Sequence, residues 1–156
     1  MPKPTLHAKA PDFTAAVIGG SYQDGDSVTL SKLKGQSVVL YFYPKDDTPG
    51  CTKQACALRD GWQSIAKKAL VFGVSTDSIK SHAKFIQKHE LPFPLITDVD
   101  QKIVNAYGVW VEKSMYGKTY KGTERSTFVI DKDGKIAAIF EKVKPDEHLA
   151  AVLAVL

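Results

Sequence analysis

The chain has 156 residues, of which 44% are apolar and 24% charged, and its formal net charge is +4. That length suits one domain, residues 1–156, with a substantial core. The lysines are dispersed, which argues against a dedicated nucleic-acid surface, and no run of 18 apolar residues suggests a membrane span. The polar segment 1–10 does not resemble a secretory signal, so we expect a cytoplasmic protein.

The N-terminal segment predicts edge structure. Alternating residues at 13–18 and a short return strand at 27–30, separated by Gly19 and Gly20, are typical of a β-hairpin. Residues 31–35 then predict a turn or a single helical turn before the next strand.

A strand, a turn and a helix follow in close succession. Residues 37–43 are apolar, β-branched and aromatic, which predicts a buried central strand that ends at Pro44. Residues 45–50 form a polar turn, and apolar side chains recur at helical spacing from Cys51 to about residue 68. Thr48 and Pro49 match an N-cap and a first helical position, so we expect Cys51 in the first turn of this helix.

The remaining pattern alternates strands with helices. We expect strands at 69–74, 95–98, 127–130 and 136–140, helices at 78–89, at 101–107 and from 145 onward, and a surface loop near the site at 108–122. The strands beginning at 38 and 70 predict a βαβ crossover, and the last two strands predict an antiparallel hairpin. The chain is therefore expected to be an α/β protein with a mixed central sheet and helices on both faces.

The predicted position of Cys51 has chemical consequences. The first turn of a helix offers unpaired backbone N–H groups and the positive end of the helix dipole, and both favour a thiolate, the nucleophilic form of cysteine. The alternative is that Cys51 is a small buried apolar residue. The polar turn around it argues against deep burial.

The chain contains one other cysteine, Cys56. In an intact helix, residues five apart have Cα atoms roughly 8 to 9 Å apart and point about 140° away from each other. A disulfide needs less than about 7 Å between the Cα atoms. A Cys51–Cys56 bond would therefore require the helix to unwind, whereas the alternative is that Cys56 only packs beside Ala55 and Leu58; the spacing leaves both interpretations open.

Several segments resemble one known family. The sequence PKDDTPGC places Pro44, Thr48 and Cys51 in the peroxiredoxin pattern P-x-x-x-T-x-x-C, and RSTFVID, beginning at Arg125, resembles the later strand that carries the peroxiredoxin arginine. The paired cysteines, GVSTDS at 73–78 and the run at 81–98 resemble the bacterioferritin comigratory protein, or peroxiredoxin Q, subfamily. The resemblance covers nearly the whole chain and implies a thioredoxin-like fold.

The resemblance also implies a mechanism. Cys51 would attack a hydroperoxide, and the Thr48 hydroxyl, the Arg125 guanidinium and the N–H groups of the 49–51 turn would donate to the leaving oxygen. Pro44 would close the pocket against water and shape the loop. Cys56 would resolve the resulting sulfenic acid as an intramolecular disulfide, which a thioredoxin or similar thiol reductant would reduce. The subfamily resemblance favours a monomer, and the reaction needs no cofactor or metal.

Other residues permit alternative interpretations. Arg125 could instead form a surface salt bridge with Glu124 or a neighbouring carboxylate. Asp46 and Asp47 could suggest a metal pair, but adjacent acids in a turn are usually solvated or capping, so we expect no metal there. Arg59 is expected to form a structural ion pair with an acid such as Asp60.

The histidines and aromatic residues favour structural roles. The histidines are scattered without metal-ligand spacing, and we expect surface or partly buried positions for all of them: His7, His82, His89 and His148. Tyr41, Tyr43 and Trp62 are expected to pack in the core, although Tyr43 could instead line the pocket.

Two other function classes stay open beside a peroxidase. A general thiol-disulfide oxidoreductase would reduce insulin, but the chain lacks a C-x-x-C motif. A redox-responsive binding or chaperone module would bind partners without turnover, and nothing in the sequence marks such a surface.

Overall fold

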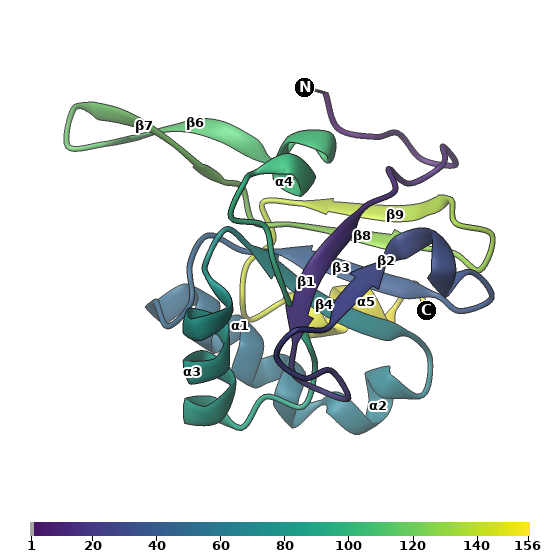
Figure 1. Cartoon of the computed structure of the whole chain (residues 1–156). Helices are drawn as coiled ribbons and strands as arrows, with labels where there is room; N and C mark the ends of the chain where they lie inside the picture. The colour runs from purple at the N-terminus through teal and green to yellow at the C-terminus, as the bar shows by residue number, and fades with distance from the viewer. Residues whose placement is uncertain (1) are drawn as a thin grey trace.

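The computed structural model describes residues 2–156 and contains a mixture of strands and helices (Figure 1). The strands are β1 (Thr14–Ile18), β2 (Ser27–Thr29), β3 (Val38–Phe42), β4 (Leu70–Ser75), β5 (Leu95–Thr97), β6 (Trp110–Met115), β7 (Lys118–Thr123), β8 (Ser126–Ile130) and β9 (Ile136–Glu141). The helices are the 3-10 turn η1 (Leu30–Leu33), α1 (Pro49–Asp60), α2 (Trp62–Ala66), α3 (Ile79–His89), α4 (Lys102–Ala106) and α5 (His148–Leu153).

A seven-stranded sheet forms the centre of the molecule, in the order β2-β1-β5-β4-β3-β8-β9. The strands β3, β4 and β5 run parallel, and the outer neighbours pair antiparallel. The predicted βαβ crossover, the N-terminal hairpin and the β8–β9 hairpin are therefore confirmed. All five side chains of β3 are buried, as expected for a central strand covered on both faces.

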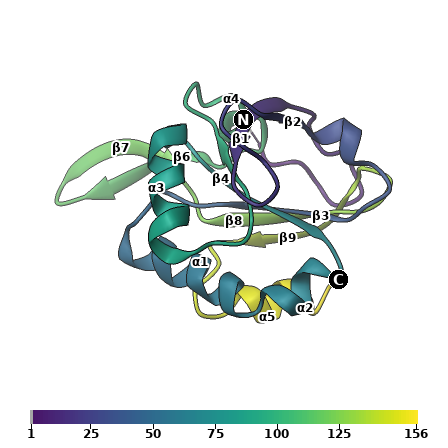
Figure 2. The ribbon, with the colours of Figure 1, turned by 60° about the horizontal axis from the view of Figure 1, so that its bottom comes forward.

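Alternate residues of β3 supply two separate hydrophobic clusters, one on each face of the sheet. Val38, Leu40 and Phe42 pack with residues of β1, η1 and α4, whereas Val39 and Tyr41 pack with residues of α1, α2, α3 and α5. Figure 2 shows α1, α2 and α5 on one side of the sheet and α4 on the other. The prediction of helices on both faces is confirmed.

The sequence predicted a loop at 108–122, and this prediction is wrong. The segment contains most of a second, two-stranded sheet. Strands β6 and β7 pair antiparallel from Trp110↔Thr123 to Met115↔Lys118, and the hairpin extends away from the main sheet in Figure 1. Its two-residue turn has positive φ at Tyr116 (53°) and Gly117 (76°), the geometry of a hairpin turn that matches strand twist. The sequence lacked an alternating pattern because most of this hairpin is exposed on both faces.

The predicted helix from Cys51 to about residue 68 is interrupted at Gly61, which separates α1 from α2. Helix α5 packs closely against this position: a Cβ added to Gly61 would lie 2.3 Å from Cδ2 of Leu149. Helix α5 is itself shorter than expected, since it begins at His148 rather than near Pro145.

Candidate active site

Cys51 lies in the first turn of α1, as predicted, and Arg125 reaches it from the segment before β8. The Nη2 atom of Arg125 donates a hydrogen bond to Sγ of Cys51 at 3.3 Å. The same guanidinium covers the start of the helix, because Nη2 lies 3.1 Å from where a Cβ on Gly50 would be. Glu124 instead pairs with Lys3 (2.9 Å), so the alternative of an Arg125–Glu124 salt bridge is wrong.

Cys51 is more deeply buried than the polar turn around it predicted, with only 2% of its surface exposed. Its side chain belongs to the cluster that contains Tyr41 and Ala55. The expectation that the turn would keep this residue near solvent is wrong, because the chain folds Arg125 and Pro145 over the turn. Burial does not isolate the sulfur, since the cationic guanidinium contacts it directly.

The backbone before Cys51 follows the predicted N-terminal geometry in part. Thr48 is the N-cap residue, with extended backbone, and Pro49 opens the helix. The Thr48 hydroxyl, however, donates to the Lys45 carbonyl at 2.8 Å and makes no capping bond. The first bond into the helix runs from Thr52 N–H to the Thr48 carbonyl (2.8 Å), so the N–H groups of Gly50 and Cys51 precede the intrahelical ladder.

Both cysteines are free thiols and lie on one uninterrupted helix, α1. Cys51 is buried and Cys56 is partly exposed. The wound helix therefore holds them in the arrangement that the spacing predicted for the reduced form, in which they cannot bond. The structure tests neither interpretation of Cys56.

Gln54 is a site residue that the sequence analysis missed. Its side chain is fully buried, and its Oε1 accepts a hydrogen bond of 2.6 Å from Nη1 of Arg125. Gln54 follows Cys51 by three residues, so both side chains lie on the same face of α1 and share one guanidinium. The three-residue spacing is the one sign in the sequence that Gln54 could share a partner with Cys51. It identifies that partner only once Arg125 is known to face α1.

The environment of His148 was predicted wrongly. Its side chain is fully buried, and its Nε2 lies 2.7 Å from the Thr127 hydroxyl. Burial, with a smaller contribution from the positive charge of Arg125, lowers the pKa of His148 to about 4. His148 is therefore a neutral imidazole, buried close enough to the Arg125 guanidinium to be affected by its charge.

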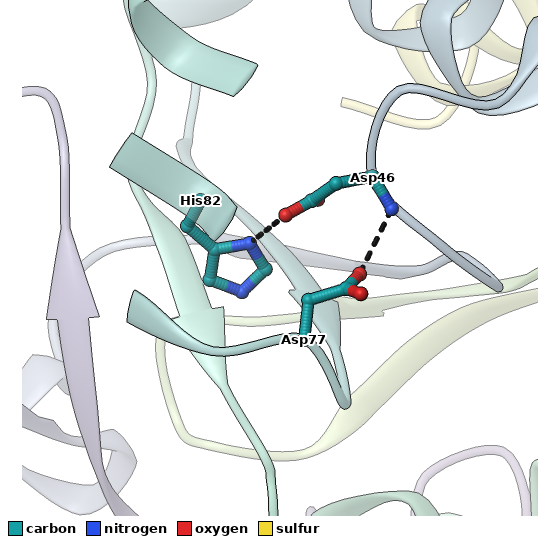
Figure 3. A group of neighbouring side chains, drawn as sticks. All are labelled: Asp46, Asp77 and His82. Atoms are coloured by element: carbon teal, nitrogen blue, oxygen red, sulfur yellow. Dashed lines mark hydrogen bonds and ion pairs between the residues drawn. The ribbon is translucent and has the colours of Figure 1, made fainter. Parts of the chain in front are cut away.

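Asp46 and His82 also differ from the expectation of solvated or surface positions, because both are buried. Figure 3 shows them with Asp77: Nδ1 of His82 lies 2.7 Å from Oδ2 of Asp46, and the Asp46 N–H donates to Oδ2 of Asp77 at 2.8 Å. These three side chains offer oxygen and nitrogen atoms within 4.8 Å of one another. Hydrogen bonds within the protein account for their close approach.

The structural interpretations of Tyr41, Tyr43 and Arg59 are confirmed, whereas Trp62 is only partly buried and packs against the core cluster. Tyr41 and Tyr43 are each 1% exposed, and the Tyr43 hydroxyl donates to Asp46 rather than lining a pocket. Arg59 pairs with Asp60 at 3.0 Å.

The hairpin contributes to the surroundings of Arg125. A surface hollow beside the guanidinium is lined by Val111 and Lys113 of β6 and by Val143. Burial and the charge of Arg125 lower the pKa of Lys113, whose ammonium donates to the Thr123 carbonyl at 2.6 Å. The segment 108–122 thus lies near the site, as expected, although as a hairpin rather than a loop.

Known proteins are similar to this chain in sequence. A model of the AhpC/TSA family matches residues 6–139. This chain belongs to the AhpC/TSA family. A putative peroxiredoxin Bcp of Coxiella burnetii is 50% identical over 146 residues, which cover 93% of both chains. The peroxiredoxin Bcp of Bacillus subtilis is 48% identical over 149 residues, covering 95% of this chain and 92% of the relative.

A solved structure extends the similarity to the fold. The bacterioferritin comigratory protein of Xanthomonas campestris, studied for its alkyl peroxide reduction activity, matches with a TM-score of 0.82 and 38% identity, covering 91% of this chain and 88% of that one. The AhpC/TSA chain is therefore a peroxiredoxin of the Bcp or peroxiredoxin Q type, and the predicted thioredoxin-like fold is confirmed. Among residues 2–156, no helix has the length and hydropathy needed to cross a membrane.

Proposed function

We propose that this chain reduces hydrogen peroxide and organic hydroperoxides through Cys51, with Cys56 as the resolving thiol and a thioredoxin-type protein as the electron donor. The observation that carries the proposal is the 3.3 Å contact between Arg125 Nη2 and Cys51 Sγ at the start of α1. A cation and a helix N-terminus that converge on one sulfur favour its anionic, nucleophilic form. The alkyl peroxide reduction activity of the Xanthomonas relative supports the same chemistry here.

The first step transfers one oxygen atom. The Cys51 thiolate attacks one oxygen of ROOH, the S–O bond forms as the O–O bond breaks, and RO⁻ leaves and takes up a proton. The charge on the leaving oxygen would be stabilised by Arg125 and by the free N–H groups of Gly50 and Cys51. Because the Thr48 hydroxyl hydrogen is engaged by the Lys45 carbonyl, its lone pairs are available to accept from the hydroperoxide OH. Pro44 would shape the turn.

The second step converts the Cys51 sulfenic acid into a disulfide. The Cys56 thiol attacks the Cys51 sulfenic acid and releases water, and the resulting bond requires the first turns of α1 to unwind. A dithiol reductant then supplies two electrons and restores both thiols. We further propose that the protein acts as a monomer, which size-exclusion chromatography tests.

Stopped-flow measurements of peroxide reduction with a thioredoxin couple test the proposal. Cys51→Ser should abolish peroxide consumption, and activity near that of the wild type would remove Cys51 from its role. Cys56→Ser should consume one equivalent of peroxide and then fail to cycle with thioredoxin. If it cycles at the wild-type rate, Cys56 is not the resolving residue. Insulin reduction without peroxide turnover would instead indicate a general oxidoreductase.

A further inference from the structure

The turn before α1, residues 44–48, is attached to α3 by a buried polar network centred on Asp46. Its carboxylate accepts hydrogen bonds from the Tyr43 hydroxyl (2.5 Å) and the Ser81 hydroxyl (2.8 Å) and lies 2.7 Å from Nδ1 of His82. Ser81 and His82 belong to the first turns of α3, more than 30 residues away in the sequence. One carboxylate therefore joins the end of β3, the turn and α3.

His82 is oriented from both sides of its ring. Its Nε2 lies 3.0 Å from the Ile96 carbonyl, which only accepts hydrogen bonds, so Nε2 carries a hydrogen. Its Nδ1 faces the Asp46 carboxyl group at 2.7 Å, so both ring nitrogens have a partner within the protein. The pair thus holds the turn through a hydrogen bond in the interior, where such a bond is strong.

The backbone of the turn is fixed by the same network. The Asp46 N–H donates to the Asp77 carboxylate at 2.8 Å (Figure 3). The same carboxylate accepts from the Ser75 hydroxyl, at the end of β4, at 2.7 Å. The next residue, Asp47, has φ of 58°, in the left-handed region that aspartate tolerates better than most residues. The network therefore constrains the backbone that leads to Thr48 and Pro49.

We propose that Asp46 and His82 are positioning residues for the peroxidase reaction. Together they hold the turn 44–48 against α3, so that Pro44, Thr48 and the start of α1 stay aligned with Arg125 around Cys51. The inference rests on the proposed function. It predicts that cutting the link slows attack on peroxide, which needs the aligned site, and speeds disulfide formation, which needs the same segment to come apart.

A series of single-turnover measurements tests this. Reduced Asp46→Asn should react with hydrogen peroxide roughly tenfold more slowly than the wild type, because small misplacements of reacting groups have large kinetic effects. Its subsequent disulfide formation should be several-fold faster. His82→Gln should show the same pair of changes, and the double variant should be little worse than either single one, because both remove one interaction.

Two control variants separate positioning from general destabilisation. Asp100→Asn makes the same chemical change at an exposed carboxylate outside the turn, which pairs with Lys102 at 3.6 Å, and should leave both rate constants within about twofold. Val28→Ala removes buried volume in the other hydrophobic cluster. It should lower the unfolding midpoint without changing the ratio of the two rate constants.

The outcomes are decisive in each case. If Asp46→Asn and His82→Gln are folded and keep both wild-type rate constants, the positioning role is overturned. If Val28→Ala shifts the two rate constants as strongly as they do, the effect is only lost stability, and the role is again overturned. If neither folds, Ser81→Ala decides, because it removes one bond to Asp46 and should produce the same two changes to a smaller extent. Failure of wild-type Cys51 to react would instead refute the proposed function.

Discussion

The turn 44–48 and the β6–β7 hairpin are both polar and lack a clear period in the sequence, yet the fold treats them in opposite ways. Asp46 in the turn is 7% exposed, whereas Tyr116 at the hairpin tip is 97% exposed. Asp46 is buried because Tyr43, Ser81 and His82 satisfy its carboxylate, while the hairpin strands bond mainly to each other. Polar composition does not decide burial; the availability of partners does.

The largest expected effect concerns the pH dependence of stability. It tests another polar side chain that is buried because it has a partner, His148, close to the site. The folded protein keeps His148 neutral down to a pKa of about 4, whereas the unfolded chain takes up a proton below the ordinary value of 6.5. The unfolded state therefore binds more protons between these values, and stability should fall by roughly 3 kcal/mol as the pH drops from 6.5 to 4. Urea titrations across this range measure it.

The matched variant for that experiment is His148→Asn, which removes the titrating group and can still bond to Thr127. Its stability should depend much less on pH in the same window. Equal slopes for the two proteins would show that His148 does not carry the effect.

A second prediction compares the hairpin with the interior of the main sheet by adding one methyl group to each. A Cβ on Gly73 of β4 would lie 2.6 Å from Leu95 Cδ2 and 2.9 Å from the Tyr41 hydroxyl, so Gly73→Ala should cost roughly 2 kcal/mol. In the hairpin, a Cβ on Gly122 would meet only flexible side chains, the nearest being Lys113 at 3.3 Å. Gly122→Ala should be nearly neutral in the same denaturation assay, and similar losses for both would contradict the contrast.

A third prediction addresses the Arg125 guanidinium, which bonds to α1 and lines the hollow beside the hairpin. Arg125→Lys keeps the positive charge but loses the planar fork that bonds Cys51 and Gln54 together. We expect the rate constant for Cys51 oxidation to fall roughly tenfold, equivalent to about 1.4 kcal/mol. Stopped-flow oxidation with a circular dichroism control measures this, and an unchanged rate would mean that charge alone suffices.

The smallest effect is expected at the exposed tip. Tyr116→Ser removes a side chain that has almost no contact with the rest of the protein, so stability should change by less than about 0.5 kcal/mol. Thermal unfolding measures it. A larger loss would show that the hairpin is held against the body more firmly than its exposure indicates.

Local pattern in the sequence determined the central strand β3, the helix start at Thr48 and Pro49, and the place of Cys51 in the first turn. Each depends on residues close together in the chain, where spacing and backbone preference act directly. The family pattern also singled out Arg125, and the fold places it on Cys51. Most of the strands and helices were predicted for the same reason.

Only the tertiary structure decided the contacts between distant segments. Gln54 could be recognised as a partner of Arg125, and Asp46 as a partner of His82, only after the sheet brought α1, β8 and α3 together. The covering of the Cys51 turn by Arg125 and Pro145, and the close approach of Leu149 to Gly61, likewise involve side chains far along the chain. Polar residues carry no periodic signal of their partners, because a hydrogen bond between distant segments is set by the position of both elements and not by local spacing.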